Sequence, residues 1–288
     1  MEQKNVLFIG GDKRMSYAAE RMFESGYFVK GFSLFPIRNY GYNECDEESI
    51  PAEISKADTV VLPIPCSPEY KLNDSVLITF SDCIDKILPG TSVYGGLISS
   101  DIKHMLNDKS VHVFDYYKWE RVSAANSVPT AQGVLKTILS LTEKTLDNVK
   151  VIVTGYGKSG SAICSILNSL HVNVVAVARS RKSREMANAA GITCKSFDLL
   201  ADEVHDADFI INTVPALVIT SKVIANLPDE ACIIDIASAP YGTDFDAAKE
   251  RGIFAVAAGG LPGKTAPQTA GIILADAIIS HMRGEKIE

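Results

Sequence analysis

One stretch of the sequence, residues 151–183, restricts the fold more than any other part of the chain. It reads VIVTGYGKSGSAICSILNSLHVNVVAVARSRKS. A β-branched run leads into a glycine-rich turn, a helix-like segment follows, and a second β-branched run ends the stretch. Strand, turn, helix and strand in this order form a unit whose two strands lie parallel in one sheet. The stretch therefore predicts an α/β protein with a parallel sheet.

The same pattern begins a second time near the N-terminus, with a helix at about 13–24 between two expected strands. The strands expected in the first half are residues 6–11, 27–32, 59–65, 91–97 and 111–114. Those of the second half are the two runs of the opening stretch and residues 193–197, 209–213, 232–237 and 254–258. Strands that alternate with helices predict parallel sheets covered on both faces. Six strands in the second half suffice for a complete dinucleotide-binding sheet.

We expect two domains. Residues 1–125 form an N-terminal α/β domain, flavodoxin-like or Rossmann-like, which holds the substrate. Residues 126–288 form a Rossmann domain with a leading interdomain helix, in whose first turn Pro129 is tolerated, and a last helix at about 266–282. The ligands are expected in a cleft between the domains, with the last helix packed back across it.

Composition excludes several classes of function. The 288 residues are 47% hydrophobic and carry a formal net charge of −7, which argues against a general nucleic-acid binder. The six cysteines show no metal-ligand spacing, so we expect no metal and reduced thiols. Neither a signal peptide nor a membrane-length apolar run is evident, which predicts a soluble, cytoplasmic protein without a membrane partner.

The glycine-rich turn of the opening stretch matches the pattern G-x-G-x-x-G in its required context. Gly155 permits the tight turn, Gly157 lets the backbone approach a pyrophosphate, and Gly160 lets helix and strand pack closely. Lys158 and Ser159 lie at the start of the helix, whose N-terminus favours bound phosphate. A plain glycine-rich turn is the alternative. The motif predicts a dinucleotide site.

The end of the second strand indicates which dinucleotide. NAD-binding domains place an acid about 20 residues past the glycines, where it accepts hydrogen bonds from the ribose. Here that zone carries Arg179, Ser180 and Arg181. Arginine can hold a ribose 2′-phosphate with two charge-assisted hydrogen bonds, and a serine hydroxyl can add another. The sequence favours NADP, although a solvated basic turn would show the same residues.

Three further segments follow strands of the second half, where ligands bind in open α/β sheets. The predicted cofactor contacts among them are Asn212, Thr213, Val214, Pro215 and Ser238. Residues 258–265, AGGLPGKT, nearly match a P-loop, but only one helix remains after them to supply magnesium and water ligands. We therefore expect an anion site there, with Lys264 and Thr265 at a helix start.

The chemistry of catalysis is not evident from the sequence. None of the five histidines lies in a recognisable catalytic setting, and the catalytic residue stays unknown. The first strand-to-helix turn, residues 10–14, lacks the glycine fingerprint, but it places Asp12 and Arg14 at a strand end. Arg14 and Lys264 are the cations expected to bind an anionic substrate.

Several motifs together resemble one known family, the A subunits of bacterial dipicolinate synthase, over nearly the whole chain. They are GGDKR at 10–14, NSVPTAQG at 126–133, GYGKSG at 155–160, NTVP at 212–215, DIAS at 235–238 and GLPGKTAP at 260–267. The PTAQG segment is also similar to the interdomain segment of D-2-hydroxyacid dehydrogenases and adenosylhomocysteinases. The catalytic histidine of the hydroxyacid dehydrogenases has no clear counterpart here.

The resemblance implies an NADP-dependent oxidoreductase that converts dihydrodipicolinate to dipicolinate in the mother cell of a sporulating bacterium. It implies a heteromeric complex with a flavoprotein-like B subunit. The expected substrate-binding residues are Asp12, Arg14, Asn126, Thr130, Lys264 and Thr265. Two alternatives stay open, a non-catalytic NADP-binding sensor or scaffold and another dehydrogenase of a small carboxylated metabolite. The sequence also leaves open whether the chain forms a homo-oligomer.

Overall fold

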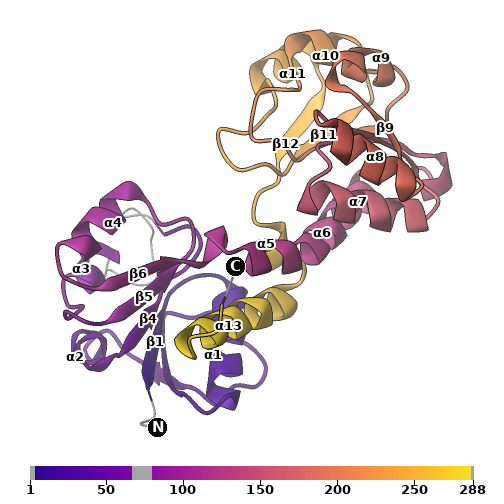
Figure 1. Cartoon of the computed structure of the whole chain (residues 1–288). Coiled ribbons are helices and arrows are strands. Elements are labelled where there is room, and N and C mark those ends of the chain that lie inside the picture. Colours follow the sequence, from indigo (N-terminus) through magenta and orange to yellow (C-terminus); the bar gives the residue numbers. More distant parts are fainter. Residues whose placement is uncertain (1–3, 67–79, 287–288) are drawn as a thin grey trace. The chain divides into compact units, whose positions relative to one another are not determined.

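The computed structural model describes residues 4–66 and 80–286, which form two compact units. The first unit combines residues up to Asn126 with the C-terminal segment from Ala266, and the second unit is Ser127–Thr265. Each unit contains a six-stranded parallel sheet with helices around it (Figure 1). The predicted α/β class with parallel sheets is therefore confirmed.

The sheet of the first unit has the strand order β3-β2-β1-β4-β5-β6. This is the order of a Rossmann sheet, whereas a flavodoxin-like sheet runs 2-1-3-4-5. Of the two expected descriptions of this domain, the Rossmann-like one is confirmed. The strands are β1 (Asn5–Ile9), β2 (Phe28–Phe32), β3 (Asn43–Cys45), β4 (Thr59–Val61), β5 (Ser92–Gly95) and β6 (His112–Asp115).

The helices of the first unit bury their apolar faces against this sheet. They are α1 (Lys13–Glu24), α2 (Ile50–Lys56), α3 (Phe80–Ile84), α4 (Ser100–Asn107), α5 (Glu120–Ala125) and α13 (Pro267–Met282), with a short 3₁₀ helix, η1 (Tyr116–Lys118). Helix α1 occupies the residues expected from the sequence. Its buried residues, such as Met15, Ala18 and Met22, recur at helical spacing and share one core cluster with Phe8 of β1.

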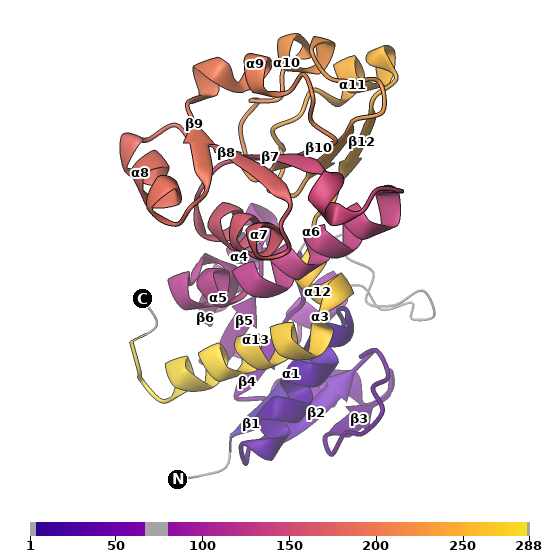
Figure 2. The same cartoon turned by 90° about the vertical axis from the view of Figure 1, so that its right-hand side faces the viewer.

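The sequence analysis assigned the last helix, α13, to the second domain, but in the structure it belongs to the first unit. It lies alongside α1 in both views (Figures 1 and 2). Gly271 permits the close approach, because a Cβ there would lie 2.4 Å from the carbonyl oxygen of Arg14. An ion pair of 2.8 Å between Arg21 Nε and Asp276 Oδ1 joins the two helices. The side-chain packing of α1 thus determines where the end of the chain docks.

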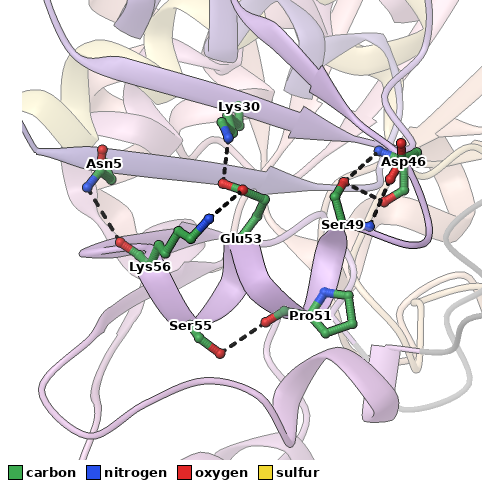
Figure 3. A network of polar contacts seen from close by, with 8 residues as sticks. All are labelled: Asn5, Lys30, Asp46, Ser49, Pro51, Glu53, Ser55 and Lys56. Atoms are coloured by element: carbon green, nitrogen blue, oxygen red, sulfur yellow. Dashed lines mark hydrogen bonds and ion pairs between the residues drawn. The ribbon is translucent and has the colours of Figure 1, made fainter.

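Polar contacts attach helix α2 to the sheet of the first unit (Figure 3). Glu53 accepts hydrogen bonds from Lys30 of β2 over 2.6 Å and from Lys56 over 3.2 Å. Ahead of the helix, the Ser49 backbone N–H donates to Asp46 Oδ1 over 2.8 Å. The hydrogen bond from Lys30, the first cause, lowers the pKa of the Glu53 carboxyl. These contacts fix the position of α2 against β2.

The second unit repeats the Rossmann order as β12-β11-β10-β7-β8-β9. Its strands are β7 (Lys150–Thr154), β8 (Asn173–Val177), β9 (Thr193–Lys195), β10 (Phe209–Asn212), β11 (Cys232–Asp235) and β12 (Phe254–Ala257). Its helices are α6 (Ser127–Leu141), α7 (Lys158–Ser169), α8 (Arg181–Ala189), α9 (Leu200–Glu203), α10 (Ser221–Ala225), α11 (Phe245–Arg251) and α12 (Leu261–Thr265), with 3₁₀ helices η2 (Leu146–Asn148) and η3 (Phe197–Leu199).

The P-loop-like segment does not form an open anion-binding loop ahead of a helix. Residues Leu261–Thr265 are themselves the short helix α12, and the Lys264 backbone N–H donates to the carbonyl of Gly260 over 3.3 Å. Helix α12 packs on α6, where a Cβ at Gly133 would lie 2.8 Å from Leu261 Cβ. The leucine and threonine of the motif therefore serve helix packing.

No helix in the described part of the chain is both long and apolar enough to cross a membrane. Within residues 4–66 and 80–286, no group of three or more histidine, cysteine, aspartate or glutamate side chains is placed to hold a metal ion. All six cysteines are free thiols, and burial raises the pKa of the thiols of Cys66, Cys83 and Cys164 to about 12.

Candidate functional site

A pocket of about 880 Å³ lies in the second unit at the carboxyl ends of four neighbouring strands. This volume is within the range of about 300–1,000 Å³ typical of small-molecule and cofactor sites. The lining residues follow β7, β8, β9 and β10: Gly155, Tyr156, Gly157, Ala178, Arg179, Ser180, Ser183, Phe197, Asp198, Leu200, Ala201, Val214, Pro215, Ala216, Leu217, Val218, Thr220, Lys222 and Val223. We call it the second-unit pocket.

The glycine turn between β7 and α7 has the geometry that a pyrophosphate site requires. Gly155 has a φ of +91°, a conformation that side chains disfavour, and a Cβ there would lie 2.3 Å from Thr213 Oγ1. A Cβ at Gly160 would lie 2.1 Å from the carbonyl oxygen of Gly155, so this glycine is needed where helix and strand pack. Gly157, the N-cap of α7, has open space around it. The turn thus leaves its backbone accessible at the N-terminus of a 12-residue helix.

The basic turn after β8 contributes one wall of the pocket. Arg179 is exposed, and none of the residues that the structure describes accepts a hydrogen bond from its guanidinium. The Ser180 hydroxyl caps α8 by accepting a hydrogen bond from the Ser183 backbone N–H over 3.0 Å. Arg181, by contrast, does not line the pocket and pairs with Glu185 over 2.7 Å. Of the two arginines expected to bind the cofactor, Arg179 has the better position.

Arg184, which the sequence analysis did not single out, holds this turn. Its Nη1 donates to the carbonyl oxygens of Ala178 and Arg179 over 3.0 and 2.7 Å. These bonds fix the backbone on both sides of the Arg179 Cα and so restrict where the Arg179 side chain can reach. A basic residue one helical turn past a helix start carries no sequence pattern that would reveal this role.

Asn212 lies behind the pocket wall and not on it. The residue is 0% exposed, and its amide oxygen accepts hydrogen bonds from Thr154 Oγ1 over 2.6 Å and from the Val214 backbone N–H over 3.0 Å. Its Nδ2 donates to the Val214 carbonyl over 3.0 Å and to Asp235 Oδ2 over 2.9 Å. All four hydrogen-bonding positions of the amide are thus used within the protein. Through Val214, the amide positions the segment that lines the pocket.

The other predicted cofactor residues differ in their access to the pocket. Val214 and Pro215 line it, whereas Thr213 turns inward and donates to the Thr154 carbonyl over 2.7 Å. Lys158 and Ser159 form the first turn of α7 beside the glycine turn without lining the pocket. Ser238 is exposed on the turn after β11, also outside the pocket lining.

Two predicted substrate residues, Asp12 and Arg14, form a tight pair at the carboxyl end of β1. Asp12 caps α1, and Arg14 Nε and Nη2 donate to its two carboxylate oxygens over 2.7–3.0 Å. Arg14 is only 9% exposed, and its Nη1 donates no hydrogen bond to the described residues. Burial alone would lower the pKa of this guanidinium, but the hydrogen bond and charge of Asp12 outweigh burial and raise it. Arg14 therefore stays cationic at the carboxyl end of β1.

The remaining predicted substrate residues are divided between the units. Asn126, the C-cap of α5, ends the first unit, and Thr130 is half-buried in α6 of the second. Lys264 is exposed, and its Nζ donates to the Gly259 carbonyl over 3.0 Å. Thr265 is the last residue of α12. Their contact with a substrate stays a prediction.

None of the five histidines, all of which lie in the described ranges, lines the second-unit pocket. Four of them are exposed on the surface, and His281 packs among aromatic rings on α13. Its Nδ1 lies 2.9 Å from the Tyr94 hydroxyl, and burial lowers its pKa from the usual 6.5. The described side chains therefore include no histidine positioned as a general base at the pocket.

Fold and site together define a class of protein. The chain has two Rossmann-like units, and the second carries a glycine fingerprint, a basic strand end and a large pocket. Residues 121–243 match the family model described as the D-isomer specific 2-hydroxyacid dehydrogenase, NAD binding domain. The second unit is thus a nicotinamide-dinucleotide-binding domain of the dehydrogenase type.

Matches to the first unit and to the whole chain indicate a more particular kind of protein within this class. Residues 5–117 match the family model of the N-terminal domain of the dipicolinate synthase A chain. The chain is 27% identical to the A chain of dipicolinate synthase of Bacillus subtilis, over 97% of this chain and 96% of that protein. The crystal structure of the corresponding chain from Bacillus halodurans is similar with a TM-score of 0.88 and 27% identity, over 97% of each chain. Over nearly its whole length, the chain is therefore similar to the A subunits of dipicolinate synthase.

A more distant likeness shows how widely this two-unit fold is used. The transhydrogenase of Sinorhizobium meliloti is 13% identical, with a TM-score of 0.72, over 97% of this chain and 93% of that one. At this identity the likeness concerns the fold alone. The closer similarity to a particular kind of protein is therefore the one to dipicolinate synthase A subunits.

Proposed function

We propose that the chain is the NADP-dependent catalytic subunit that oxidises dihydrodipicolinate to dipicolinate. The observation that carries the proposal is the second-unit pocket, which joins an open glycine turn to an exposed arginine at the end of β8. The similarity to dipicolinate synthase A subunits over nearly the whole chain supports the choice of substrate. In the reaction, the dihydropyridine ring gives a hydride to NADP and a proton to solvent, and becomes an aromatic pyridine.

The residues of the pocket fit the phosphates of NADP. The backbone at Gly157 and the N-terminus of α7 suit a pyrophosphate, because no side chain occupies the space that a Cβ would fill. Arg179, which has no acceptor among the described residues, suits the ribose 2′-phosphate, and no acid follows β8 directly to repel it. Apolar residues from β9 to α10 suit the adenine ring.

The substrate is a dicarboxylate, which needs cations and hydrogen-bond donors more than a base. Formation of an aromatic ring favours loss of the hydride, so orientation against the nicotinamide is the main requirement. Arg14, held by Asp12 at the carboxyl end of β1, is the cation that we propose for one carboxylate. Lys264 is the cation that we propose for an anion on the second unit, and the Thr265 hydroxyl is proposed as a hydrogen-bonding group beside it. Asn126 and Thr130 remain predicted contacts.

The relatives are described as subunits, and we propose that this chain also works with a B subunit in a heteromeric complex of a sporulating cell. One observation favours a second function, that of a non-catalytic NADP-binding subunit whose partner performs the chemistry. No histidine lines the pocket, and the described lining includes only one acid, Asp198.

An assay of hydride transfer distinguishes the two functions. The chain is mixed with NADP and dihydrodipicolinate labelled with deuterium at the carbon that loses hydride, with and without the partner subunit. Label recovered in NADPH by the chain without its partner, with dipicolinate formed in equal amount, supports the catalytic function. If the chain alone binds NADP but yields no labelled NADPH, and the label appears in NADPH only when the partner is present, the non-catalytic function is supported.

A further inference from the structure

One acid among the residues that line the second-unit pocket is unexpected in a site for a polyanion. Asp198 lies in η3, directly after β9, and is exposed towards solvent. A carboxylate there repels phosphate groups. If it serves the ligand, it must face a part of the ligand that donates hydrogen bonds.

The surroundings of Asp198 indicate which part this is. Arg179, the proposed partner of the 2′-phosphate, follows β8, and β9 is the strand next to β8 at the edge of the sheet. The same pocket is also lined by apolar side chains that follow β9 and β10, namely Leu200 and Ala201 of α9, Val223 of α10, and Leu217 and Val218. Apolar side chains in the same pocket as Arg179 suit the adenine ring.

Adenine has one hydrogen-bond donor outside the sugar, its exocyclic amino group. We infer that the Asp198 carboxylate accepts a hydrogen bond from this amino group and so selects adenine over a base with an oxo group at that position. The inference depends on the proposed function, because it assumes that the pocket holds the adenosine end of NADP.

The state of the carboxylate agrees with an acceptor role. A hydrogen bond from the Ser196 side chain, the first cause, lowers the pKa of Asp198, and the charge of Arg184 acts in the same direction. Asp198 forms no ion pair with a described residue, including Lys222, which also lines the pocket. An ionised carboxylate is an acceptor only, and it repels the oxo group of hypoxanthine where it binds the amino group of adenine.

Binding titrations test this selection. The dissociation constants of NADP and of its hypoxanthine analogue are measured by calorimetry for the wild type, Asp198→Ala, Asp198→Asn and the control Asp202→Ala. Asp202 is an acid of α9 outside the pocket lining. We expect the wild type and Asp202→Ala to bind NADP more tightly than the hypoxanthine analogue. In Asp198→Ala, the ratio of the two dissociation constants should fall about tenfold, the effect of one charge-assisted hydrogen bond.

The two Asp198 variants separate the outcomes. Asp198→Asn keeps an acceptor oxygen but loses the charge, so its preference falls because the hypoxanthine analogue binds more tightly. A preference unchanged in both Asp198 variants, with NADP still bound, overturns the inference and leaves the proposed function standing. A wild type that binds neither dinucleotide overturns the proposed function itself.

Discussion

Asn212 Nδ2 donates a hydrogen bond to Asp235 Oδ2 over 2.9 Å, and both residues are 0% exposed. The same carboxylate accepts from the backbone N–H groups of Ala237 and Gly242 and from the Thr243 hydroxyl. The ends of β10 and β11 are thereby joined behind the second-unit pocket. The buried pair supports the Val214 segment of the pocket wall but does not itself line the pocket.

Removal of the Asn212 amide should loosen this support. Asn212→Ala leaves the Val214 N–H and one position of the Asp235 carboxylate without a partner in a buried place. We expect the free energy of unfolding of the second unit to fall by about 1–3 kcal/mol, measured by chemical denaturation. Asn173→Ala, at an exposed position of β8, is the control. Equal stability of the two variants would contradict a supporting role for Asn212.

Gly242 should be sensitive to a single added methyl group. A Cβ at this position would lie 2.4 Å from the Val214 carbonyl oxygen and 2.5 Å from that of Ala216. Because these are backbone atoms of the pocket wall, the wall must move. We expect Gly242→Ala to lower stability by about 1–3 kcal/mol, and to weaken NADP binding. Gly259→Ala is the matched control, since nothing lies within 4 Å of its added Cβ. Unaltered NADP affinity in Gly242→Ala would show that the wall is not part of the cofactor site.

If Arg14 binds the substrate, its replacement should weaken the binding of dipicolinate but not that of NADP. Arg14→Gln should raise the dissociation constant of dipicolinate about tenfold or more, the effect of one charged hydrogen bond. The dissociation constant of NADP, measured in the same titrations, should stay unchanged. Lys13→Gln makes the same change of charge at the neighbouring exposed position. If both variants bind dipicolinate alike, Arg14 does not contact the substrate.

His281 should make the first unit less stable in mild acid. Burial lowers its pKa from 6.5, so the folded unit holds it neutral at a pH where the unfolded chain takes up a proton. Protonation therefore favours unfolding, an effect that is absent above 6.5 and complete below the folded pKa. His281→Gln should flatten the fall in melting temperature as pH decreases through this window. His104→Gln, at an exposed position of α4, should leave that fall as it is in the wild type.

The sequence predicted most of the fold because the strands of both sheets are short β-branched or apolar runs next to glycine turns. It missed β3, whose three residues, Asn43–Cys45, carry no apolar alternation and join the sheet by backbone pairing with β2. The sequence predicted that α13 is a helix, but it did not predict that this helix belongs to the first unit. The fit of Gly271 against α1 connects residues more than 250 positions apart, and no local pattern encodes such a contact.

Some residues of the candidate site could be predicted from the sequence, and others could not. Glycine spacing and charge placed Gly155, Gly157 and Arg179 at the pocket, because turns at strand ends must lie at one edge of a parallel sheet. Strand-end position alone could not tell that Asn212 points into the protein while Val214 faces the pocket. Leu217, Asp198 and Lys222 carry no motif, so only the folded chain reveals that they line the pocket.

Selection of NADP by Arg179 is the point on which the proposed function most depends. The direct measurement is the affinity of the wild type and of Arg179→Asp for NADP and NAD. Loss of a charge-assisted pair to the 2′-phosphate, together with the new repulsion, should weaken NADP binding about tenfold to hundredfold. NAD binding should change little, so the preference for NADP should disappear. Equal losses for both dinucleotides, or no loss for either, would contradict the role of Arg179 as the residue that selects NADP.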